Sequence, residues 1–293
     1  MIKSNYIIKP PENGKIRWYK SKKTISAKSS KLKRIKMTHK AKRIYLIKTL
    51  LAEKSLYGNI VIPEDEQGQK DLLRSLMNVR LPAPLTDEYI KVESEYLKKE
   101  AKEKGITRFS DLKPVKDGLY VRKGDITTLE CDAVVNAADP RMLGCFHPLH
   151  DCVDNRIHSA AGLSLRNCCS EIMKKQGHDE PPGKAKMTPA FNLPCKYILH
   201  TVGPMVNVTF NTAYEEQLAS CYRSCLSLAE EYGCKNIAFC SISAEAFGFA
   251  QIRAAQTAVK TVTEYRAASG SGIEVIFNVF NDEDQKIYID LIG

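Results

Sequence analysis

The stretch Asp132-Ala133-Val134-Val135-Asn136-Ala137-Ala138-Asp139 decides the fold class, because a short apolar run leads directly into a polar turn. The apolar residues Ala133 to Val135 are typical of a buried strand. In a chain whose strands and helices alternate, ligands bind in the crevice at the carboxyl end of a strand. We therefore expect a ligand site in the segment that follows Asp139.

Strands and helices alternate along the rest of the chain from Leu119 onward. Apolar runs of strand length are separated by longer segments with helical periodicity. We expect strands near residues 119–123, 131–136, 196–201, 236–241 and 273–279, and helices near residues 154–175, 215–232 and 251–268. This alternation predicts a largely parallel sheet with helices on both faces.

Three potential soft-metal ligands, Cys145, His150 and Cys152, lie within eight residues in the segment 142–152, the metal loop. Two thiolates and one imidazole suit Zn²⁺, and three protein ligands leave a coordination position open, as in catalytic zinc sites. No second cysteine pair at C-x2-C spacing is present to complete a structural site. The alternative is a coincidence of buried free cysteines and a hydrogen-bonding histidine. His147 is a weaker ligand candidate.

Composition limits the class of protein. At 293 residues with 43% apolar residues, the chain can bury one substantial core and a smaller appendage. Its ten cysteines lie between Cys131 and Cys240 without a disulfide framework, which favours a reducing cytoplasm. No apolar stretch approaches the roughly 20 residues that cross a bilayer. We therefore expect a cytoplasmic protein with no membrane partner.

Positive charge is concentrated in residues 1–50. They hold 16 Lys or Arg and one acid, Glu12, whereas the remaining chain holds 28 basic and 33 acidic residues. Their lysine and serine content predicts a basic, disordered leader. Such a segment could instead contact nucleic acid or an anionic membrane surface, with Trp18 and Tyr19 as a stacking platform. Translation from Met37 would remove most of this charge.

Residues 51–112 have the pattern of a small helical extension that precedes a main domain at residues 113–293. The apolar residues between Leu72 and Met77 recur at helical spacing, and the sequence Arg80-Leu-Pro-Ala-Pro84 ends that helix. Thr86 is placed to cap a second helix. These helices are expected to form a layer that docks on the main domain.

Six motifs occur in order between Gly124 and Phe249. They are Gly124-Asp-Ile-Thr127; Asp132 to Asp139; Asp154-Asn-Arg-Ile-His158 with Ala161-Gly162; Thr188 to Pro194; Ile198 to Pro204; and Ser241-Ile-Ser243 with Phe247-Gly-Phe249. Together they resemble the macrodomain, an ADP-ribose-binding module, and the insert from Gly144 to Cys152 resembles the zinc-containing macrodomains of microbes. The resemblance implies an α/β fold: a three-layer α/β/α macrodomain with a mixed, largely parallel central sheet.

The resemblance also implies roles for individual residues. Asp125 would accept the exocyclic amine of adenine while Ile126 covers the ring, although an Asp that caps a turn is the alternative interpretation. Asn136 and Asp139 would act on the distal ribose as the catalytic pair. Gly144 permits close backbone approach to the ligand. A second loop would receive the diphosphate; its residues are Ser243, Ala244, Phe247, Gly248 and Phe249.

The chain departs from the family pattern at several positions. Asp139 stands where most macrodomains have Asn, and Glu245 stands in the second loop where Ser-Thr-Gly is usual. The Glu245 carboxylate would repel a diphosphate, and its Cβ removes the conformational freedom of glycine. Ala190 and Ala250 replace residues that are usually Gly and Pro. These changes predict weaker ADP-ribose binding.

The resemblance implies an enzyme, a protein ADP-ribosyl hydrolase that uses zinc to remove mono-ADP-ribose from modified proteins. Hydrolysis at C1″ of the distal ribose passes through an oxocarbenium-like state, which a polarising metal and a positioned water favour. The expected attachment point is an acidic side chain, and the expected partner is a sirtuin-like ADP-ribosyltransferase. A non-catalytic reader of ADP-ribosylated proteins is the alternative. Asp151 is either a base or a solvated acid, and His158 and His200 are expected to be satisfied structural histidines.

Overall fold

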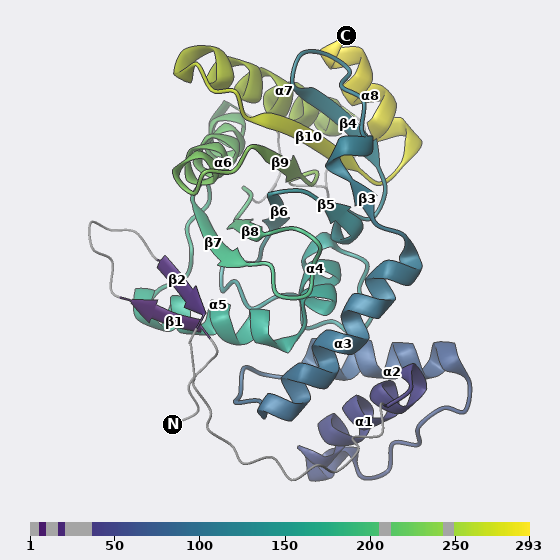
Figure 1. The fold of residues 1–293 in the computed structure, drawn as a ribbon. Coiled ribbons are helices and arrows are strands. Elements are labelled where there is room, and N and C mark those ends of the chain that lie inside the picture. Colours follow the sequence, from purple (N-terminus) through teal and green to yellow (C-terminus); the bar gives the residue numbers. More distant parts are fainter. Residues whose placement is uncertain (1–5, 10–16, 21–36, 205–211, 243–248) are drawn as a thin grey trace.

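A six-stranded mixed sheet forms the centre of the protein (Figure 1). The computed structural model describes residues 6–9, 17–20, 37–204, 212–242 and 249–293. The strand order is β4-β10-β9-β6-β8-β7, and only the edge strand β7 runs antiparallel to its neighbour. The strands are β4 (Leu119–Lys123), β6 (Ala133–Ala137), β7 (Ala185–Pro189), β8 (Tyr197–Thr201), β9 (Asn236–Phe239) and β10 (Glu274–Val279).

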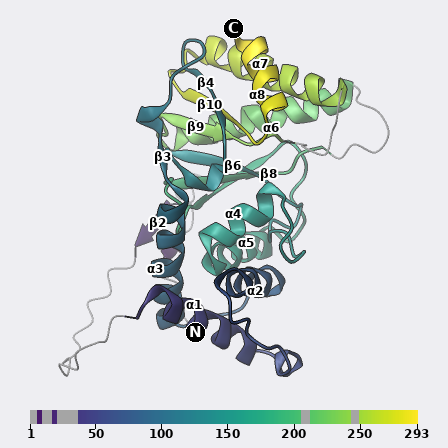
Figure 2. The ribbon, with the colours of Figure 1, turned by 90° about the vertical axis from the view of Figure 1, so that its right-hand side faces the viewer.

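Helices cover both faces of this sheet. They are α4 (Val153–Ala161), α5 (Leu163–Gln176), α6 (Thr212–Glu231), α7 (Phe249–Ser269) and α8 (Asp282–Ile292). Helix α7 contacts both α6 and α8 on one side, whereas α4 and α5 lie on the other side (Figure 2). The predicted three-layer macrodomain fold with a mixed, largely parallel sheet is confirmed. Among the described residues, no helix is both long enough and apolar enough to span a membrane.

Three elements of the main domain differ from the sequence-based expectation. The helix expected near residues 154–175 is divided at Gly162, which adopts a left-handed φ of 91°. A Cβ at Gly162 would lie 2.6 Å from Glu93 Oε2, so glycine is needed where the extension meets the main domain. The edge strand β7 and the C-terminal helix α8 were not predicted individually.

Three helices, α1 (His39–Ala52), α2 (Glu66–Val79) and α3 (Asp87–Lys104), form the helical extension. The predicted cap is confirmed, because the Thr86 side chain accepts a hydrogen bond from Tyr89 N at 3.1 Å. The extension has its own apolar core, which one residue of α5 joins. Its members are Leu46, Ile47, Leu50, Leu73, Leu76, Met77, Leu85, Tyr89, Val92, Tyr96 and Leu163.

The expectation of a disordered leader over residues 1–50 is wrong for its last part. Helix α1 begins within that range, and its apolar residues Leu46, Ile47 and Leu50 are at most 2% exposed. The lysines of α1 raise the charge of the segment without preventing its apolar face from packing on α2 and α3. Two short strands, β1 (Tyr6–Lys9) and β2 (Arg17–Lys20), also pair within this range.

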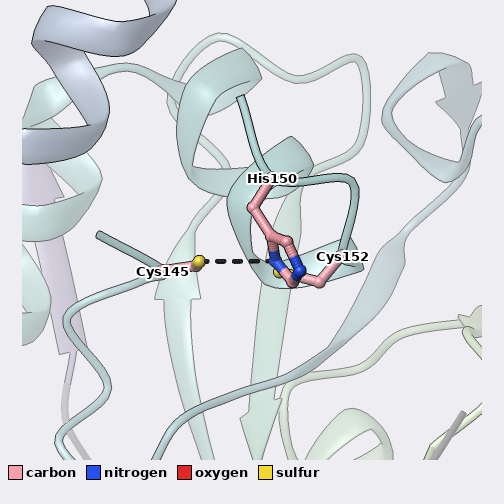
Figure 3. A group of neighbouring side chains, drawn as sticks. All are labelled: Cys145, His150 and Cys152. Atoms are coloured by element: carbon pink, nitrogen blue, oxygen red, sulfur yellow. Dashed lines mark hydrogen bonds between the residues drawn. The ribbon is translucent and has the colours of Figure 1, made fainter. Parts of the chain in front are cut away.

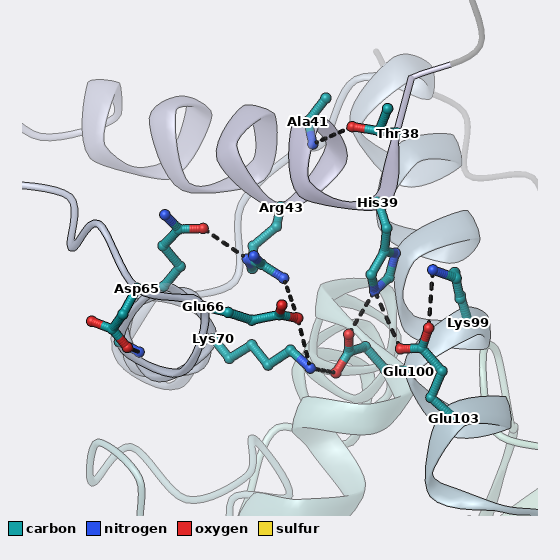
Figure 4. Close-up of polar contacts among 12 residues, drawn as sticks. Thr38, His39, Ala41, Arg43, Asp65, Glu66, Lys70, Lys99, Glu100 and Glu103 are labelled. Atoms are coloured by element: carbon teal, nitrogen blue, oxygen red, sulfur yellow. Dashed lines mark hydrogen bonds and ion pairs between the residues drawn. The ribbon is translucent and has the colours of Figure 1, made fainter.

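Ion pairs tie the three helices of the extension together (Figure 4). Glu66 of α2 accepts from Arg43 of α1 at 3.0 Å and from Lys70 at 3.2 Å. Lys70 also lies 3.1 Å from Glu100 of α3, which His39 of α1 contacts at 2.6 Å. Because the network spans all three helices, it favours one relative arrangement of them.

Short elements complete the description. They are η2 (Ser55–Tyr57), η3 (Phe109–Asp111), η4 (Ile126–Thr128) and the parallel pair β3 (Thr107–Arg108) and β5 (Leu129–Glu130). Helix α3 contacts both α4 and η4, and α2 contacts α4. The extension therefore packs against the side of the main domain that carries the metal loop.

Candidate functional site

Four adjacent strands, β4, β10, β9 and β6, are parallel and end at the same edge of the sheet. Asp125 follows β4, Phe280 follows β10, and residues 240–248 follow β9. Asn136 lies near the carboxyl end of β6, which precedes the metal loop. The carboxyl edge of such a sheet is where ligands bind, so the topology gathers four loops around one candidate site.

Asp125 is held as an ionised hydrogen-bond acceptor. Its Oδ1 accepts from Thr127 N at 2.9 Å and from Thr127 Oγ1 at 2.6 Å, and Lys104 Nζ lies 3.4 Å from Oδ2. Burial raises the pKa of Asp125, but the Thr127 hydrogen bonds and the Lys104 charge outweigh burial and leave it below the usual value. The carboxylate thus caps η4 and remains 21% exposed. Ile126 beside it is 5% exposed.

Phe280 presents an aromatic face at the same edge. Its side chain is 62% exposed, and the Arg156 guanidinium lies 4.9 Å from the ring centroid. Arg156 also donates to Asp151 Oδ1 at 2.7 Å. Asp151 is therefore a partner of Arg156 on the surface of the metal loop. An exposed ring at the edge of the sheet that also carries Asp125 can receive a flat heteroaromatic group.

Asn136 and Asp139 occupy different environments. Asn136 is fully buried, and its Nδ2 lies 2.8 Å from Asp154 Oδ1 and 3.2 Å from His200 Nδ1. Its Oδ1 has no hydrogen-bond partner among the described residues. The Asp139 carboxylate is partly exposed and accepts from Arg141 N and Nε, both at 3.0 Å. Asn136 therefore keeps one acceptor free, whereas Asp139 is held by its neighbour.

Asp154 and His158 form a buried acid–histidine pair next to Asn136. Asp154 Oδ1 and His158 Nε2 are 3.5 Å apart. Burial raises the pKa of Asp154 to about 6, although the hydrogen bond from Asn136 lowers it. Burial also lowers the pKa of His158, so its ring is neutral. Of the two groups, only the Asp154 carboxyl titrates near neutral pH, whereas His158 stays neutral.

The expectation that His158 is a satisfied structural histidine is wrong. Neither of its ring nitrogens has a hydrogen-bond partner within the described part of the chain. Gly144 of the metal loop lies against the ring: a Cβ there would come within 2.6 Å of His158 Cγ, and its φ is 78°. His200, by contrast, has partners, because its Nε2 lies 3.0 Å from Thr188 Oγ1. Burial lowers the pKa of His200 to about 3, which keeps it neutral.

Cys145, His150 and Cys152 come together in the metal loop (Figure 3). Their ligand atoms all lie within 4.8 Å of one another, and Cys145 Sγ is 3.6 Å from His150 Nδ1. In a tetrahedral zinc site, bond lengths of about 2.3 Å to sulfur and 2.05 Å to nitrogen separate those two atoms by about 3.6 Å. Donor type and spacing thus fit a zinc ion. His147 lies outside this group of three ligands.

Cys152 is also the N-cap of α4. Its Sγ accepts from Asn155 N at 3.4 Å, at the end of the helix where partial positive charge favours a thiolate. Burial raises the pKa of the Cys152 thiol to about 11, although the Asn155 N–H lowers it. A cation that binds here displaces the thiol proton, so metal affinity should increase with pH.

The loop expected to receive the diphosphate comes directly before α7. Ser243, Ala244, Phe247 and Gly248, together with Glu245, lie outside the described residues. Phe249 begins α7, so a helix N-terminus does follow this loop.

Sequence reasoning missed three residues of the site. Asp154 and His158 lie four residues apart, which places them on one face of a helix, but without a metal motif this spacing is not distinctive. Phe280 directly follows the last strand of the sheet, and this position at the carboxyl end could have identified it.

Comparisons with known proteins agree with the fold. The family model of the Macro domain matches residues 135–258. A protein-ADP-ribose hydrolase of Treponema medium is 49% identical over 261 residues, covering 88% of this chain and 100% of that protein. One from Staphylococcus aureus strain Mu50 is 43% identical over 258 residues, covering 87% of this chain and 97% of that protein.

Solved structures share the same architecture. The Trypanosoma brucei macrodomain in complex with ADP-ribose superposes with a TM-score of 0.58 at 26% identity. The match covers 75% of this chain and 95% of that structure. With a relative 49% identical across nearly the whole chain, the chain belongs to the macrodomain family.

Proposed function

We propose that this protein removes mono-ADP-ribose from modified proteins by zinc-dependent hydrolysis at C1″ of the distal ribose. The observation that carries the proposal is the cluster of Cys145, His150 and Cys152 at the ligand-binding edge of a macrodomain sheet. The names of the two bacterial relatives and the ADP-ribose complex of the trypanosome macrodomain support this substrate.

Adenine would bind between Asp125 and Phe280. The Asp125 carboxylate, held by Thr127, would accept an N–H of the exocyclic amine. The exposed ring of Phe280 would stack on the base. Because Thr127 holds the Asp125 carboxylate, this group would lose little conformational entropy on binding.

The distal ribose would lie between Asn136 and the metal loop. The free Oδ1 of buried Asn136 would accept from a ribose hydroxyl and so fix the sugar. Gly144 lets the loop backbone approach closely, as its contact with His158 shows. Asp154, whose pKa is raised to about 6 by burial, can accept or return a proton beside the reacting sugar.

The metal would strengthen this chemistry. A zinc ion held by Cys145, His150 and Cys152 would supply Lewis-acid polarisation of a substrate or water oxygen. Asn136 would orient the sugar, and the Asp154 carboxyl beside it would accept or return the proton. Asp139, which is tied to Arg141, would contribute through the shape of the turn.

The cellular setting is part of the proposal. We propose that the modified residue is acidic, and that a sirtuin-like ADP-ribosyltransferase produces the substrate, because hydrolysis requires a prior transfer reaction. All ten cysteines are free, which supports a reducing compartment such as the cytoplasm. A contact of residues 1–36 with nucleic acid would give nucleic-acid binding that falls steeply with salt and disappears in a chain that starts at Met37.

The test measures free ADP-ribose released from a mono-ADP-ribosylated protein. Wild-type protein should release it, a chelator should abolish release, and added zinc should restore it. Full turnover after complete removal of the metal would contradict zinc dependence. ADP-ribose binding without release under either condition would instead identify a reader.

A further inference from the structure

We infer that helix α2 of the extension sets the ligand geometry of the metal loop, and that Arg74 is a positioning residue for metal binding. The inference rests on the zinc site of the proposed function and concerns residues that do not themselves touch the metal. Its basis is a set of hydrogen bonds that joins α2 to the metal loop and to α4.

The metal loop has little regular structure of its own. It lies between β6 and α4 without helix or strand. Met142 and Leu149 adopt left-handed φ angles of 56° and 58°, which are costly for residues that carry a Cβ. Such backbone persists only where surrounding groups stabilise it. Contacts from outside the loop should therefore contribute to the ligand geometry.

Arg74 supplies one such support. Its Nη2 donates to the carbonyl oxygen of His150 at 2.7 Å and to Asn155 Oδ1 at 2.9 Å. Its Nε donates to the same Asn155 oxygen at 3.2 Å. A single rigid guanidinium thus fixes the backbone of one metal ligand relative to α4.

Asn155, which Arg74 contacts, makes hydrogen bonds to two further residues of the loop. It is fully buried, and its Nδ2 donates to the carbonyl oxygen of His147 at 2.9 Å. Its backbone N–H donates to Cys152 Sγ at 3.4 Å. Arg74 therefore connects, directly or through Asn155, to two of the three metal ligands. Residues that hydrogen-bond to metal ligands without touching the metal orient those ligands and change the metal affinity.

The C-terminal end of α2 holds the loop at two further points. Asn78 Oδ1 accepts from the backbone N–H of Leu149 at 3.1 Å, where the chain is left-handed. Arg166 of α5 donates to the carbonyl oxygen of Leu143 at 2.7 Å and to the Met77 carbonyl of α2, also at 2.7 Å. The loop is thus tied to α2 near both of its ends.

The test compares the zinc affinity of three variants with that of the wild type. Arg74→Ala removes the hydrogen bonds to His150 and to Asn155. Arg74→Lys keeps the charge and the approximate length, but an ammonium group cannot make both sets of bonds with the fixed geometry of a guanidinium. Arg108→Ala is the matched control, because this exposed arginine pairs with Glu130 and not with the metal loop. Metal-free proteins are titrated with zinc against a chromogenic chelator, and their melting temperatures are recorded with and without zinc.

Arg74→Ala should raise the zinc dissociation constant about 10- to 100-fold. Arg74→Lys should raise it by a smaller factor, and Arg108→Ala should leave it unchanged. The melting temperature gained on adding zinc should shrink in the Arg74 variants, a change that a purely structural role in the metal-free fold would not produce.

The outcomes separate the inference from the proposed function. A wild type that binds zinc, with Arg74 variants that bind it equally well, overturns the inference and leaves the zinc site standing. A wild type that binds no zinc defeats the proposed function itself. If Arg74→Ala does not fold, the Lys variant decides, and an unchanged dissociation constant in that variant overturns the inference.

Discussion

Glu93→Gln should remove a pH dependence of stability that the junction between the extension and the main domain imposes. Glu93 of α3 is 1% exposed, and its Oε1 accepts from Leu163 N at the start of α5 at 3.1 Å. Its Oε2 has no hydrogen-bond partner among the described residues. Burial raises the pKa of Glu93 to about 7, although Leu163 N–H and the Arg80 charge lower it. Gln keeps the size and the acceptor but does not titrate.

The change in the free energy of unfolding with pH follows from the difference between the folded and unfolded pKa values of Glu93. Between its ordinary pKa of 4.5 and about 7, the folded protein keeps this proton while the unfolded chain releases it. The stabilisation by the protonated group is therefore complete below about pH 4.5 and is lost as the pH rises through 7. The full change corresponds to ~3 kcal/mol, of which ~2.5 kcal/mol falls between about pH 5 and about pH 8.

Urea unfolding measures this change directly. Free energies of unfolding of the wild type and of Glu93→Gln are compared at four pH values from about 5 to about 8. All other titrating groups are common to both proteins, so the difference between them isolates Glu93. The stability of the wild type relative to the variant should fall by ~2.5 kcal/mol over this range. Glu88→Gln, at an exposed position of the same helix, should show no such change.

Two results would refute this reasoning. Parallel stability curves would mean that Glu93 has the same pKa in the folded and unfolded chains, so that its burial is compensated. A relative stability that rises with pH would mean that the positive charge of Arg80 outweighs desolvation and that Glu93 is ionised in the fold.

Three further outcomes are expected. The wild type should carry about one zinc per chain, and Cys152→Ala should lose both the metal and ADP-ribose release. Its circular dichroism spectrum should stay unchanged, because the metal loop lies outside the sheet. Full zinc occupancy in the variant, measured by metal analysis, would contradict this prediction. Asp125→Ala should weaken ADP-ribose binding by ~1–3 kcal/mol in calorimetry, because a charge-assisted hydrogen bond is lost, and unchanged affinity would place adenine elsewhere. A chain that starts at Met37 should keep its melting temperature and activity, because Thr38 still caps α1 at 3.1 Å, and a drop in either would assign a role to residues 1–36.

Local signals in the sequence were sufficient for much of the fold. The apolar run at Ala133 to Val135 is a fully buried strand, and Thr86 caps α3 as its position suggested. Each depends on residues within a few positions of one another, which is the range over which strand and capping signals act. Helix α1 was missed because charge dominated the interpretation of residues 1–50, although Leu46, Ile47 and Leu50 are spaced for one helix face.

Tertiary packing determined what sequence reasoning could not find. Asp154 is buried, and the His158 ring nitrogens have no hydrogen-bond partner among the described residues, because of how Asn136, Gly144 and the sheet surround α4. Burial of this kind changes a pKa, but no spacing in the sequence encodes it. Two residues that a helical pattern presents as ordinary are thus placed next to the candidate catalytic Asn136.

In the metal loop, the identity of the ligands could be predicted from the sequence, whereas the contacts that support them could not. Its ligands Cys145, His150 and Cys152 lie within eight residues, so their spacing alone suggested a site. Their support comes from much farther away, since Arg74 is 76 positions from His150 and Asn78 is 71 positions from Leu149. Ligand identity is therefore a local property, whereas ligand geometry belongs to the contact between two parts of the chain. A macrodomain with the same Cys-x4-His-x-Cys spacing but without α2 should accordingly carry the donors and bind zinc more weakly.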